Sequence, residues 1–309
     1  GHLYRVTNHA ECFERLGYRT HVIGAAAAYA AISALPDLRG IIVFRPLFNQ
    51  QFAAWREIAS ARGVPFLADL DDLTFDLDVL DAGEWNYWLT LSSDQQTHWR
   101  ERFLCQRRAL EMVDGAIAST PPLALSLASL VPRCWVWPNG FGHLSWSIAM
   151  QCRERQAADP TSPGEEIVIG YASGTPTHGA DFAVAVPALQ QLLSQSSNVR
   201  LQVLGSLDLS AYPALKDVSD QIRCLPLVPY AQLPTMLSRF DINLAPLDLS
   251  SRFCAAKSEL KFFEAAAVGV PTVASATPPF KEVIQQSANG FIAETTEEWI
   301  AGLSELVHQ

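Results

Sequence analysis

The sequence lacks a long apolar run, a metal-type cysteine pattern and an excess of basic residues. Its most apolar segment, VIGAAAAYAAISAL (22–35), is too short to span a bilayer, and the N-terminus lacks the basic-then-apolar order of a signal peptide. Six cysteines are scattered without C-x-x-C spacing. They favour reduced, buried thiols in a cytoplasmic protein over disulfides or a zinc site.

The net charge and the length of the chain further restrict the class of protein. With 22 basic and 32 acidic residues the formal charge is −10, which argues against general affinity for nucleic acid or anionic membranes. An anionic ligand would therefore need a local site. The 309 residues, 49% of them hydrophobic, are enough for two globular domains of about 150 residues each.

Short apolar segments alternate with helical patterns in both halves of the chain. In the first half the predicted strands are THVIG (20–24), GIIVF (40–44), VPFLADL (64–70), GAIAST (115–120) and CWVWPNG (134–140). In the second half they are EIVIGYAS (166–173), VRLQVLG (199–205), IRCLPLV (222–228), INLAPL (242–247) and PTVAS (271–275). This alternation predicts an α/β protein with a parallel sheet in each half.

The polar segment RERQAADPTSPGEE (153–166) has the composition of a linker. It predicts domains over residues 1–155 and 165–309, with ligands bound in a cleft at the carboxyl ends of their strands. The chain opens on a predicted helix, YRVTNHAECFERLG (4–17), where such a domain normally opens on a strand. We therefore expect that the first strand is missing or that the chain is part of a longer polypeptide.

One apolar helix, in the segment KSELKFFEAAAVGVPTVAS (257–275), carries charged residues. At about 100° per residue, Lys257, Lys261 and Glu264 fall on one stripe, and Gly269 ends the helix before a buried strand. The positions predicted to pack on the sheet are Leu260, Phe263, Ala266 and Ala267. The charged stripe is either a surface ion pair of Lys261 with Glu264 or the wall of a ligand site.

The same segment, preceded by FDINLAPL (240–247), resembles the C-terminal domain of glycosyltransferase family 4 and its relatives. IVIGYASGTPTHGADF (167–182), LQVLG (201–205) and LPLVPYAQLPTMLSRFD (225–241) follow in the order that this family uses. The resemblance therefore covers most of residues 165–309. In the first half only VWPNGF (136–141) and FLADLDDLTFD (66–76) are similar to family segments.

The resemblance implies a GT-B fold, in which two Rossmann-like, doubly wound domains face a central cleft. It implies a glycosyltransferase of hexosyl or deoxyhexosyl type that moves a sugar from a nucleotide diphosphate sugar to a glycan or lipid-linked glycan. Retention of configuration, independence of metal and other cofactors, and a role in bacterial surface polysaccharide synthesis are implied as well. The expected location is the cytoplasm, or its side of the inner membrane as a peripheral protein.

Two other functions stay open at this point. One is a non-catalytic GT-B module of a larger glycan-assembly protein, and the other is a nucleotide-sugar epimerase of the same architecture.

The resemblance also implies a role for each charged residue of the helix. Glu264 aligns with the glutamate that accepts hydrogen bonds from the ribose hydroxyls, while Lys257 and Lys261 neutralise the diphosphate as catalytic cations. The other implied donor-binding residues are Ser173, Gly174, Thr175, His178, Gly205, Val228 and Tyr230. The turn at Ser173 lets the backbone approach phosphate, and it has neither the G-x-G-x-x-G nor the P-loop pattern.

The sequence departs from the family at the acidic residue expected near the transferred sugar, where Ala255 and Ala256 stand. Either Glu259 or Asp248 replaces that acid, or the enzyme is impaired.

In the first half, Asp69, Asp71 and Asp72 follow a predicted strand. We assign Asp71 and Asp72 to acceptor binding or base catalysis, with helix or loop capping and a metal site as the alternatives. The resemblance disfavours the metal. Further acceptor-side candidates are Asn8, His9 and Arg45, and an aromatic cluster that either stacks on sugar or packs on the sheet, Trp85, Tyr87, Trp88 and Trp99.

Overall fold

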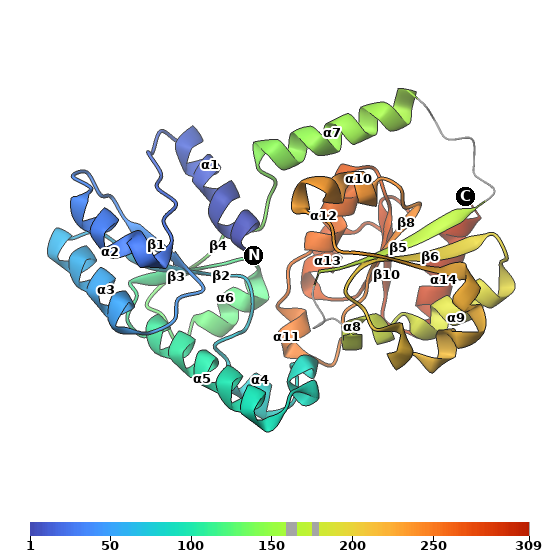
Figure 1. Cartoon of the computed structure of the whole chain (residues 1–309), viewed down its shortest axis with the longest axis horizontal. Coiled ribbons are helices and arrows are strands. Elements are labelled where there is room, and N and C mark those ends of the chain that lie inside the picture. Colours follow the sequence, from blue (N-terminus) through green and yellow to red (C-terminus); the bar gives the residue numbers. More distant parts are fainter. Residues whose placement is uncertain (159–165, 175–178, 309) are drawn as a thin grey trace. The chain divides into compact units, whose positions relative to one another are not determined.

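The computed structural model describes residues 1–158, 166–174 and 179–308. The chain divides into two compact units, residues 1–143 with 256–258, and residues 144–255 with 259–309 (Figure 1). The units part at residues 143 and 144, whereas the domain limits predicted from the linker are 155 and 165. Residues 159–165 of that linker lie outside the described residues, and the predicted central cleft stays a prediction.

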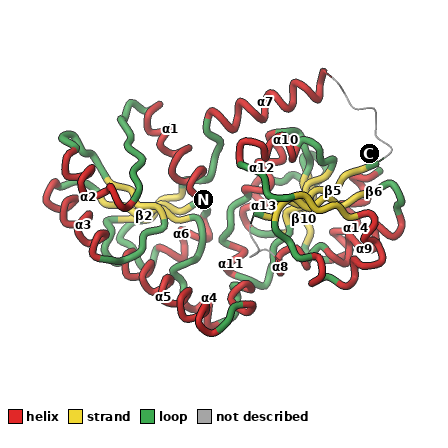
Figure 2. Tube along the Cα trace, in the orientation of Figure 1, coloured by secondary structure: helices red, strands yellow, loops and turns green. Residues whose placement is uncertain are grey.

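The first unit holds a four-stranded parallel sheet in the order β1-β2-β3-β4. Its strands are β1 (Ile41–Phe44), β2 (Phe66–Leu70), β3 (Gly115–Ala118) and β4 (Cys134–Val136). Its helices are η1 (Leu3–Thr7), α1 (Asn8–Arg15), α2 (Ala25–Ala34), α3 (Gln50–Arg62), α4 (Leu77–Asp81), η2 (Asn86–Thr90), α5 (Ser93–Leu110) and α6 (Pro121–Leu127). Figure 2 shows these strands in yellow among helices in red.

Local signals explain several helix ends of this unit. Asn49 caps α3 by accepting a hydrogen bond from the Phe52 amide, and Gly63 ends the helix at a φ of 63°. Ser92 and Gln95 form a capping box at the start of α5. Phe52 of α3 and Phe103 of α5 are fully buried with Phe66 of β2.

One predicted strand of the first unit is wrong. Residues 20–24 (THVIG) form no strand, and the side chains of Tyr18 and Val22 are more than half exposed. A β-pattern becomes a strand only when a neighbouring strand supplies hydrogen-bond partners, and none pairs with this segment. The predicted N-terminal helix is confirmed, and it ends at Gly17 with a φ of 88°.

The second unit holds a six-stranded parallel sheet. Its strands are β5 (Ile167–Ser173), β6 (Val199–Gly205), β7 (Ile222–Leu225), β8 (Ile242–Ala245), β9 (Thr272–Ser275) and β10 (Gly290–Ala293). Its helices are α7 (His143–Ala158), α8 (Gly179–Ala183), α9 (Val186–Gln195), η4 (Leu209–Ala211), η5 (Pro213–Gln221), η6 (Tyr230–Gln232), α10 (Leu233–Leu237), α11 (Arg252–Ala255), α12 (Leu260–Ala267), α13 (Pro278–Val283) and α14 (Thr296–Val307).

Strand order in the second unit is β7-β6-β5-β8-β9-β10, which is the doubly wound order of nucleotide-binding sheets. The order reverses between β5 and β8, which makes the carboxyl ends of these two strands the topological switch point, where ligands bind in sheets of this kind. Tyr171 and Trp299 are among the largest fully buried side chains of this unit. The prediction of two parallel-sheet α/β units is therefore confirmed.

The charged helix begins later than predicted. Helix α12 starts at Leu260, so Lys257 lies before it and shares no helical stripe with Lys261 and Glu264. Its buried side chains are Phe262, Ala265 and Ala267, whereas Leu260, Phe263 and Ala266 are only half-buried. The end is as predicted, because Gly269 adopts a φ of 83° and its amide donates to the Ala266 carbonyl at 3.0 Å.

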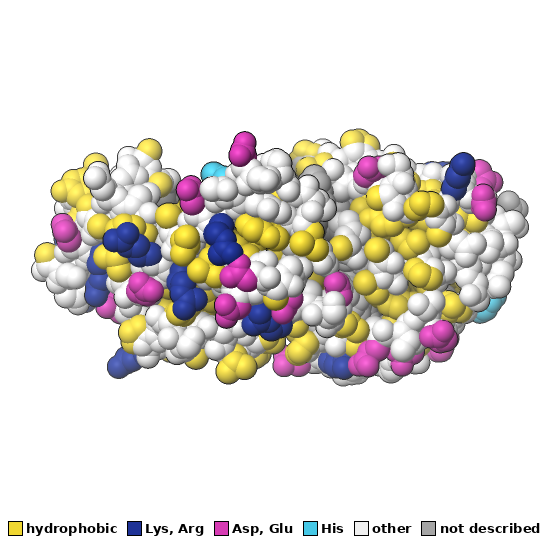
Figure 3. All heavy atoms as spheres, turned by 90° about the horizontal axis from the view of Figure 1, so that it is seen from below, with side chains coloured by type: hydrophobic (Ala, Val, Ile, Leu, Met, Phe, Trp, Pro, Cys, Tyr) yellow, Lys and Arg dark blue, Asp and Glu magenta, His cyan; other side chains and the backbone are white. Residues whose placement is uncertain are grey.

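Basic and hydrophobic side chains share one face of the first unit. Figure 3, which views the side where α4 and α5 lie in Figure 1, shows Lys and Arg side chains interleaved with hydrophobic ones. A pocket of about 510 Å³ on this unit is lined by Phe48, Leu77, Leu104, Cys105, Arg107, Arg108 and Glu111. No helix within residues 1–158, 166–174 and 179–308 is long and apolar enough to cross a membrane.

Two glycines with positive φ provide a test of the fold. A Cβ on Gly205 would lie 1.8 Å from the Ser173 carbonyl oxygen, whereas the nearest atom to a Cβ on Gly269 would be 3.9 Å away. We expect Gly205→Ala to lower the free energy of unfolding by about 3 kcal/mol and Gly269→Ala by only about 1 kcal/mol. Urea unfolding measures both, and equal losses would contradict the predicted backbone clash.

Candidate active site

The carboxyl edge of β5 and β6 has the close backbone packing expected of a phosphate-binding turn. Ser173 is buried and its hydroxyl donates to the Ser206 carbonyl at 2.9 Å, while the Ser206 amide donates to the Ser173 carbonyl at 3.2 Å. Gly205 lies between them with a φ of 106°, and Gly174 is exposed. The predicted residues Thr175 and His178 lie outside the described residues.

Lys261 reaches this edge from α12. Its ammonium donates to the Ala172 carbonyl of β5 and lies 5.0 Å from the centroid of the Tyr171 ring. Asn243 of β8 donates to the Lys261 carbonyl at 3.1 Å, so the helix is fixed to the strand next to β5. Glu264 follows three residues later on the same helix and is half-buried. The structure thus brings Lys261 to the switch point of the second sheet.

The turn after β7 lies at the same carboxyl edge of the second sheet. Val228 and Tyr230 are half-buried, and Tyr230 begins the short helix η6. The side chain of Leu227 comes within 3.5 Å of the position a Cβ on Gly205 would take. The turns after β6 and β7 are therefore adjacent.

The two candidates for the missing acid are in different surroundings. Asp248 Oδ1 accepts hydrogen bonds from the Ser250 amide at 2.9 Å and its hydroxyl at 2.7 Å, which is a turn-capping role. Glu259 directly precedes α12, and burial raises the pKa of its carboxyl, opposed by a backbone hydrogen bond. Ala256 is 2% exposed, so a longer side chain has no space at that position.

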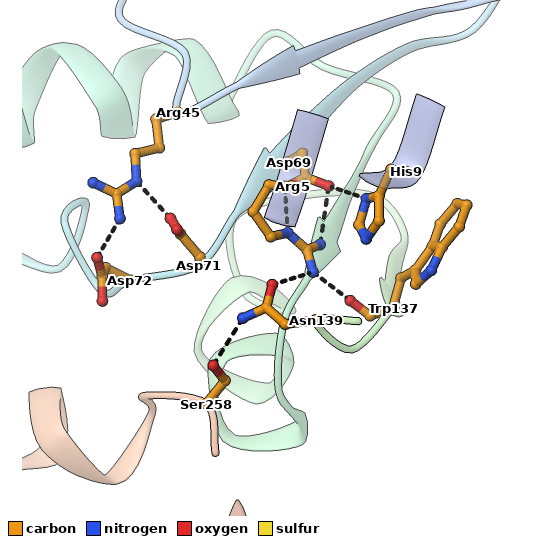
Figure 4. A network of polar contacts seen from close by, with 9 residues as sticks. All are labelled: Arg5, His9, Arg45, Asp69, Asp71, Asp72, Trp137, Asn139 and Ser258. Carbon is orange, nitrogen blue, oxygen red and sulfur yellow. Dashed lines mark hydrogen bonds and ion pairs between the residues drawn. The ribbon is translucent and has the colours of Figure 1, made fainter. Parts of the chain in front are cut away.

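The first unit contains a buried ion pair at the carboxyl edge of its sheet (Figure 4). Asp69 of β2 is 1% exposed at its side chain and Arg5 is 0% exposed. The guanidinium donates to both carboxylate oxygens, at 2.8 and 2.9 Å, and through Nη1 to the Trp137 carbonyl at 2.5 Å. Asp69 is therefore a structural anchor of this sheet edge.

His9 joins the same cluster from α1. Its Nδ1 lies 3.6 Å from Asp69 Oδ2, and its ring stacks on Trp137 with centroids 4.3 Å apart. Its Nε2 is buried and makes no hydrogen bond to the described residues. Asn8 donates to the Gly140 carbonyl at 2.7 Å, which fixes α1 to the segment after β4.

Arg45 bridges the other two aspartates of the edge. It follows β1 in the left-handed region, with a φ of 46°, and donates through Nε to Asp71 at 2.5 Å and through Nη2 to Asp72. Burial lowers the pKa of Arg45, but the charges of Asp72 and Asp71 outweigh it and raise that pKa overall. Burial and the charge of Asp71 raise the pKa of Asp72, while Arg45 and Lys257 oppose the rise.

Lys257 belongs to this edge and to the first unit. Thr120 donates to the Ala256 carbonyl at 2.8 Å, and Asn139 Nδ2 donates to Ser258 Oγ at 2.8 Å, so both neighbours of Lys257 are held. The predicted grouping of Lys257 with Lys261 and Glu264 on one helix is therefore wrong.

The structure also bears on the predicted metal site and on the predicted aromatic cluster. Within the described ranges, no three His, Cys, Asp or Glu side chains are placed to hold a metal ion. In the aromatic cluster, Trp85 is 7% exposed and packs against Trp99 and Phe103, with ring centroids 5.0 and 5.6 Å away. For Trp85 the packing alternative holds, while Tyr87, Trp88 and Trp99 are half-buried.

Arg5, Thr120, Asn139 and Ser258 are residues of the edge that the sequence interpretation did not assign. The spacing of Arg5 and His9, four residues apart on one helix, was a readable signal. The contacts of Thr120 and Asn139 bridge 136 and 119 positions, and no local pattern reports them.

Loss of the Arg45 charge should give a pH-dependent instability. In Arg45→Met the ionised Asp71 and Asp72 repel each other, so the folded pKa of Asp72 rises further above its unfolded value. Stability is then lost as pH increases from the ordinary aspartate pKa through the raised one. We expect a loss of about 1 kcal/mol at pH 7, because the pair is partly exposed, and a smaller loss at pH 4.

Urea unfolding at the two pH values measures this difference. Arg100→Met, which breaks the exposed pair with Asp81, is the matched control and should change little at either pH. A loss in Arg45→Met that is equal at pH 4 and pH 7 would contradict the electrostatic explanation.

The comparisons with known proteins agree with this fold. Residues 166–309 match the family described as glycosyl transferases group 1. No curated protein sequence matches the chain. The lipopolysaccharide glycosyltransferase WaaG has 13% identity and a TM-score of 0.57, over 92% of this chain and 86% of its own.

Two further solved structures are similar over most of the chain. HepE from Anabaena, in complex with UDP-glucose, has 13% identity and a TM-score of 0.57, over 92% of this chain and 72% of its own. A UDP-forming trehalose-phosphate synthase from Burkholderia xenovorans has 11% identity and a TM-score of 0.56, over 96% and 74%. The resemblance is confirmed: residues 166–309 match the group 1 glycosyl transferases, and the chain has the GT-B fold of solved glycosyltransferases.

Proposed function

We propose that the chain is a retaining glycosyltransferase that takes a UDP-sugar as donor and needs no metal. One observation carries the proposal: Lys261 and Gly205 lie at the switch point of a sheet with nucleotide-binding strand order, and the half-buried Glu264 follows Lys261 on the same helix. HepE was crystallised with UDP-glucose, which supports the choice of uridine.

Each donor group has a matching partner in the second unit. A carboxylate accepts two hydrogen bonds, so Glu264 suits the vicinal hydroxyls of ribose. The backbone near Ser173 and Gly174 suits the diphosphate, because a small residue there allows close approach. The turn at Val228 and Tyr230 borders the uracil.

The chemistry depends on the leaving group. The bond between the anomeric carbon and the diphosphate oxygen breaks, and negative charge develops on the diphosphate. The oxygen of an acceptor hydroxyl bonds to the anomeric carbon, and its proton passes to the leaving diphosphate. The ammonium of Lys261 is already fixed by the Ala172 carbonyl, so it stabilises that charge without reorganising. A fixed protein cation performs the role that a divalent metal has in other transferases.

The acceptor is assigned to the carboxyl edge of the first unit. Asp71 and Asp72, held by Arg45, offer acceptor oxygens to the hydroxyls of a glycan. Because WaaG acts in lipopolysaccharide biosynthesis, a surface glycan or its lipid-linked precursor is the proposed acceptor class.

Attachment of the protein to the inner membrane face is part of the same proposal. Helix α5 carries Arg107 and Arg108 beside Leu104, which is 47% exposed. Such a basic face with apolar side chains suits an anionic lipid surface.

The rival function is a non-catalytic module, favoured by Ala255 and Ala256 in place of an acid. Both proposals require nucleotide binding, and sugar transfer separates them. Ala255→Glu is the variant to test for restored transfer, since Ala255 is only partly buried whereas Ala256 has no space.

Binding of UDP tests the ribose assignment. We expect Glu264→Ala to weaken UDP binding by about 1–3 kcal/mol, because the ribose hydroxyls lose their acceptor. Isothermal titration calorimetry measures the change. Glu297→Ala, in the first turn of α14, is the matched control, and unchanged affinity in Glu264→Ala would overturn the assignment.

Turnover with and without chelator tests the metal-free mechanism. Lys261→Ala should lower kcat by an amount equivalent to about 2.7–4 kcal/mol, and excess chelator should leave the wild type active. Lys281→Ala removes a surface lysine that pairs with Glu294 and should have no effect. Loss of activity in chelator would show that a metal carries the diphosphate charge.

A further inference from the structure

The segment that carries Lys257 is covalently continuous with the second unit on both sides, yet it packs as part of the first. Ala256 is 2% exposed, and Lys257 and Ser258 are half-buried. Two side chains of the first unit hold it, one on each side of Lys257.

The Thr120 hydroxyl both accepts and donates a hydrogen bond. It is 1% exposed and caps α6, where its oxygen accepts a hydrogen bond from the Leu123 amide at 3.3 Å. Its own proton goes to the Ala256 carbonyl at 2.8 Å. A hydroxyl has one proton and lone pairs to accept with, so serine could replace threonine here and valine could not.

Asn139 is oriented by its two partners. Arg5 has only donors, so the Asn139 oxygen must face Arg5 Nη1, at 3.3 Å, and its amide nitrogen faces Ser258 Oγ at 2.8 Å (Figure 4). Arg5 is in turn fixed by the buried Asp69. The position of Ser258 is thereby tied to the ion pair at the centre of the first unit.

Lysine is scarce in this protein. The chain has four lysines, Lys216, Lys257, Lys261 and Lys281, and none before residue 216. Lys257 is thus the one lysine of the first unit, where it opposes the rise that burial causes in the pKa of Asp72.

We propose that Thr120 and Asn139 are positioning residues that hold Lys257 on the first unit, at the edge that carries Asp72. Lys257 then partly neutralises the acceptor edge together with Arg45. Of the two lysines Lys257 and Lys261, only Lys261 serves the donor diphosphate. The effect on turnover rests on the proposed function, whereas the placement of Lys257 does not.

Nuclear magnetic resonance of the full chain tests the placement without any substrate. The lysines are labelled by reductive ¹³C-methylation, and Lys→Arg variants assign the four side-chain signals. We expect Asp72→Asn to shift the Lys257 signal in the wild type, and to shift it less than half as much in Thr120→Val and in Asn139→Ala. Thr120→Ser should keep the full shift.

Ser126→Ala is the matched control, because its hydroxyl donates within α6 to the Pro122 carbonyl at 3.3 Å and does not contact the Lys257 segment. Circular dichroism checks that each variant is folded, and either of the two disrupting variants suffices if the other unfolds. An undiminished shift in a folded Thr120→Val or Asn139→Ala overturns the proposal.

A second readout separates this inference from the proposed function. With UDP-glucose as the probe donor, Thr120→Val should lower kcat at least about fivefold with donor KM unchanged, and Thr120→Ser should restore it. If the wild type neither transfers nor hydrolyses UDP-glucose, the proposed function loses support for that donor while the resonance result still decides the placement. A higher donor KM in Thr120→Val with unchanged kcat would instead assign Lys257 to donor binding.

Discussion

The buried ion pair of Arg5 with Asp69 is the interaction on which the carboxyl edge of the first unit depends. Both side chains are removed from water, so each charge must be compensated within the protein. Arg5 satisfies its donors on Asp69, on the Trp137 carbonyl and on Asn139. These contacts fix η1, β2 and the segment after β4 to one another, because loss of Asp69 would leave a buried charge unpaired and loss of a neutral acceptor would leave a buried donor unsatisfied.

The end of β2 carries one enclosed, structural carboxylate and is followed by two carboxylates in a more open environment. Asp69 lies within β2 and is enclosed, whereas Asp71 and Asp72 follow the strand and share the partly exposed Arg45. Two carboxylates beside one guanidinium leave a net negative charge, and the charge of Asp71 together with burial raises the pKa of Asp72. A closely spaced acidic trio therefore divides into an anchor and a polar edge suited to hydroxyl-bearing ligands.

The second unit concentrates its polar groups for a different reason. In a parallel sheet the carboxyl ends of the strands lie on one edge, and a reversal of strand order keeps helices from covering it. Ser173, Gly205 and Lys261 meet there because β5 is the strand at which the order reverses. Its two backbone turns approach closely since Gly205 has no Cβ to block the Ser173 carbonyl.

Local sequence determined the elements that need only short-range signals. In the part of the chain that the structure describes, nine of the ten strands correspond to predicted segments, and Gly17 and Gly269 end helices as expected, because periodicity and left-handed glycine are properties of a few neighbouring residues. The ordered family segments also identified the second unit, including Lys261 and Glu264 on one helix.

Tertiary structure decided the rest. The THVIG pattern found no partner strand, and the short β10 (Gly290–Ala293) became a strand by pairing with β9. Lys257 lies before the helix on which its spacing had placed it, since Thr120 and Asn139 bind the residues on either side of it. A strand exists only with its neighbour, and a hydrogen bond across more than a hundred residues forms only once the chain is folded, so neither can be read from spacing alone.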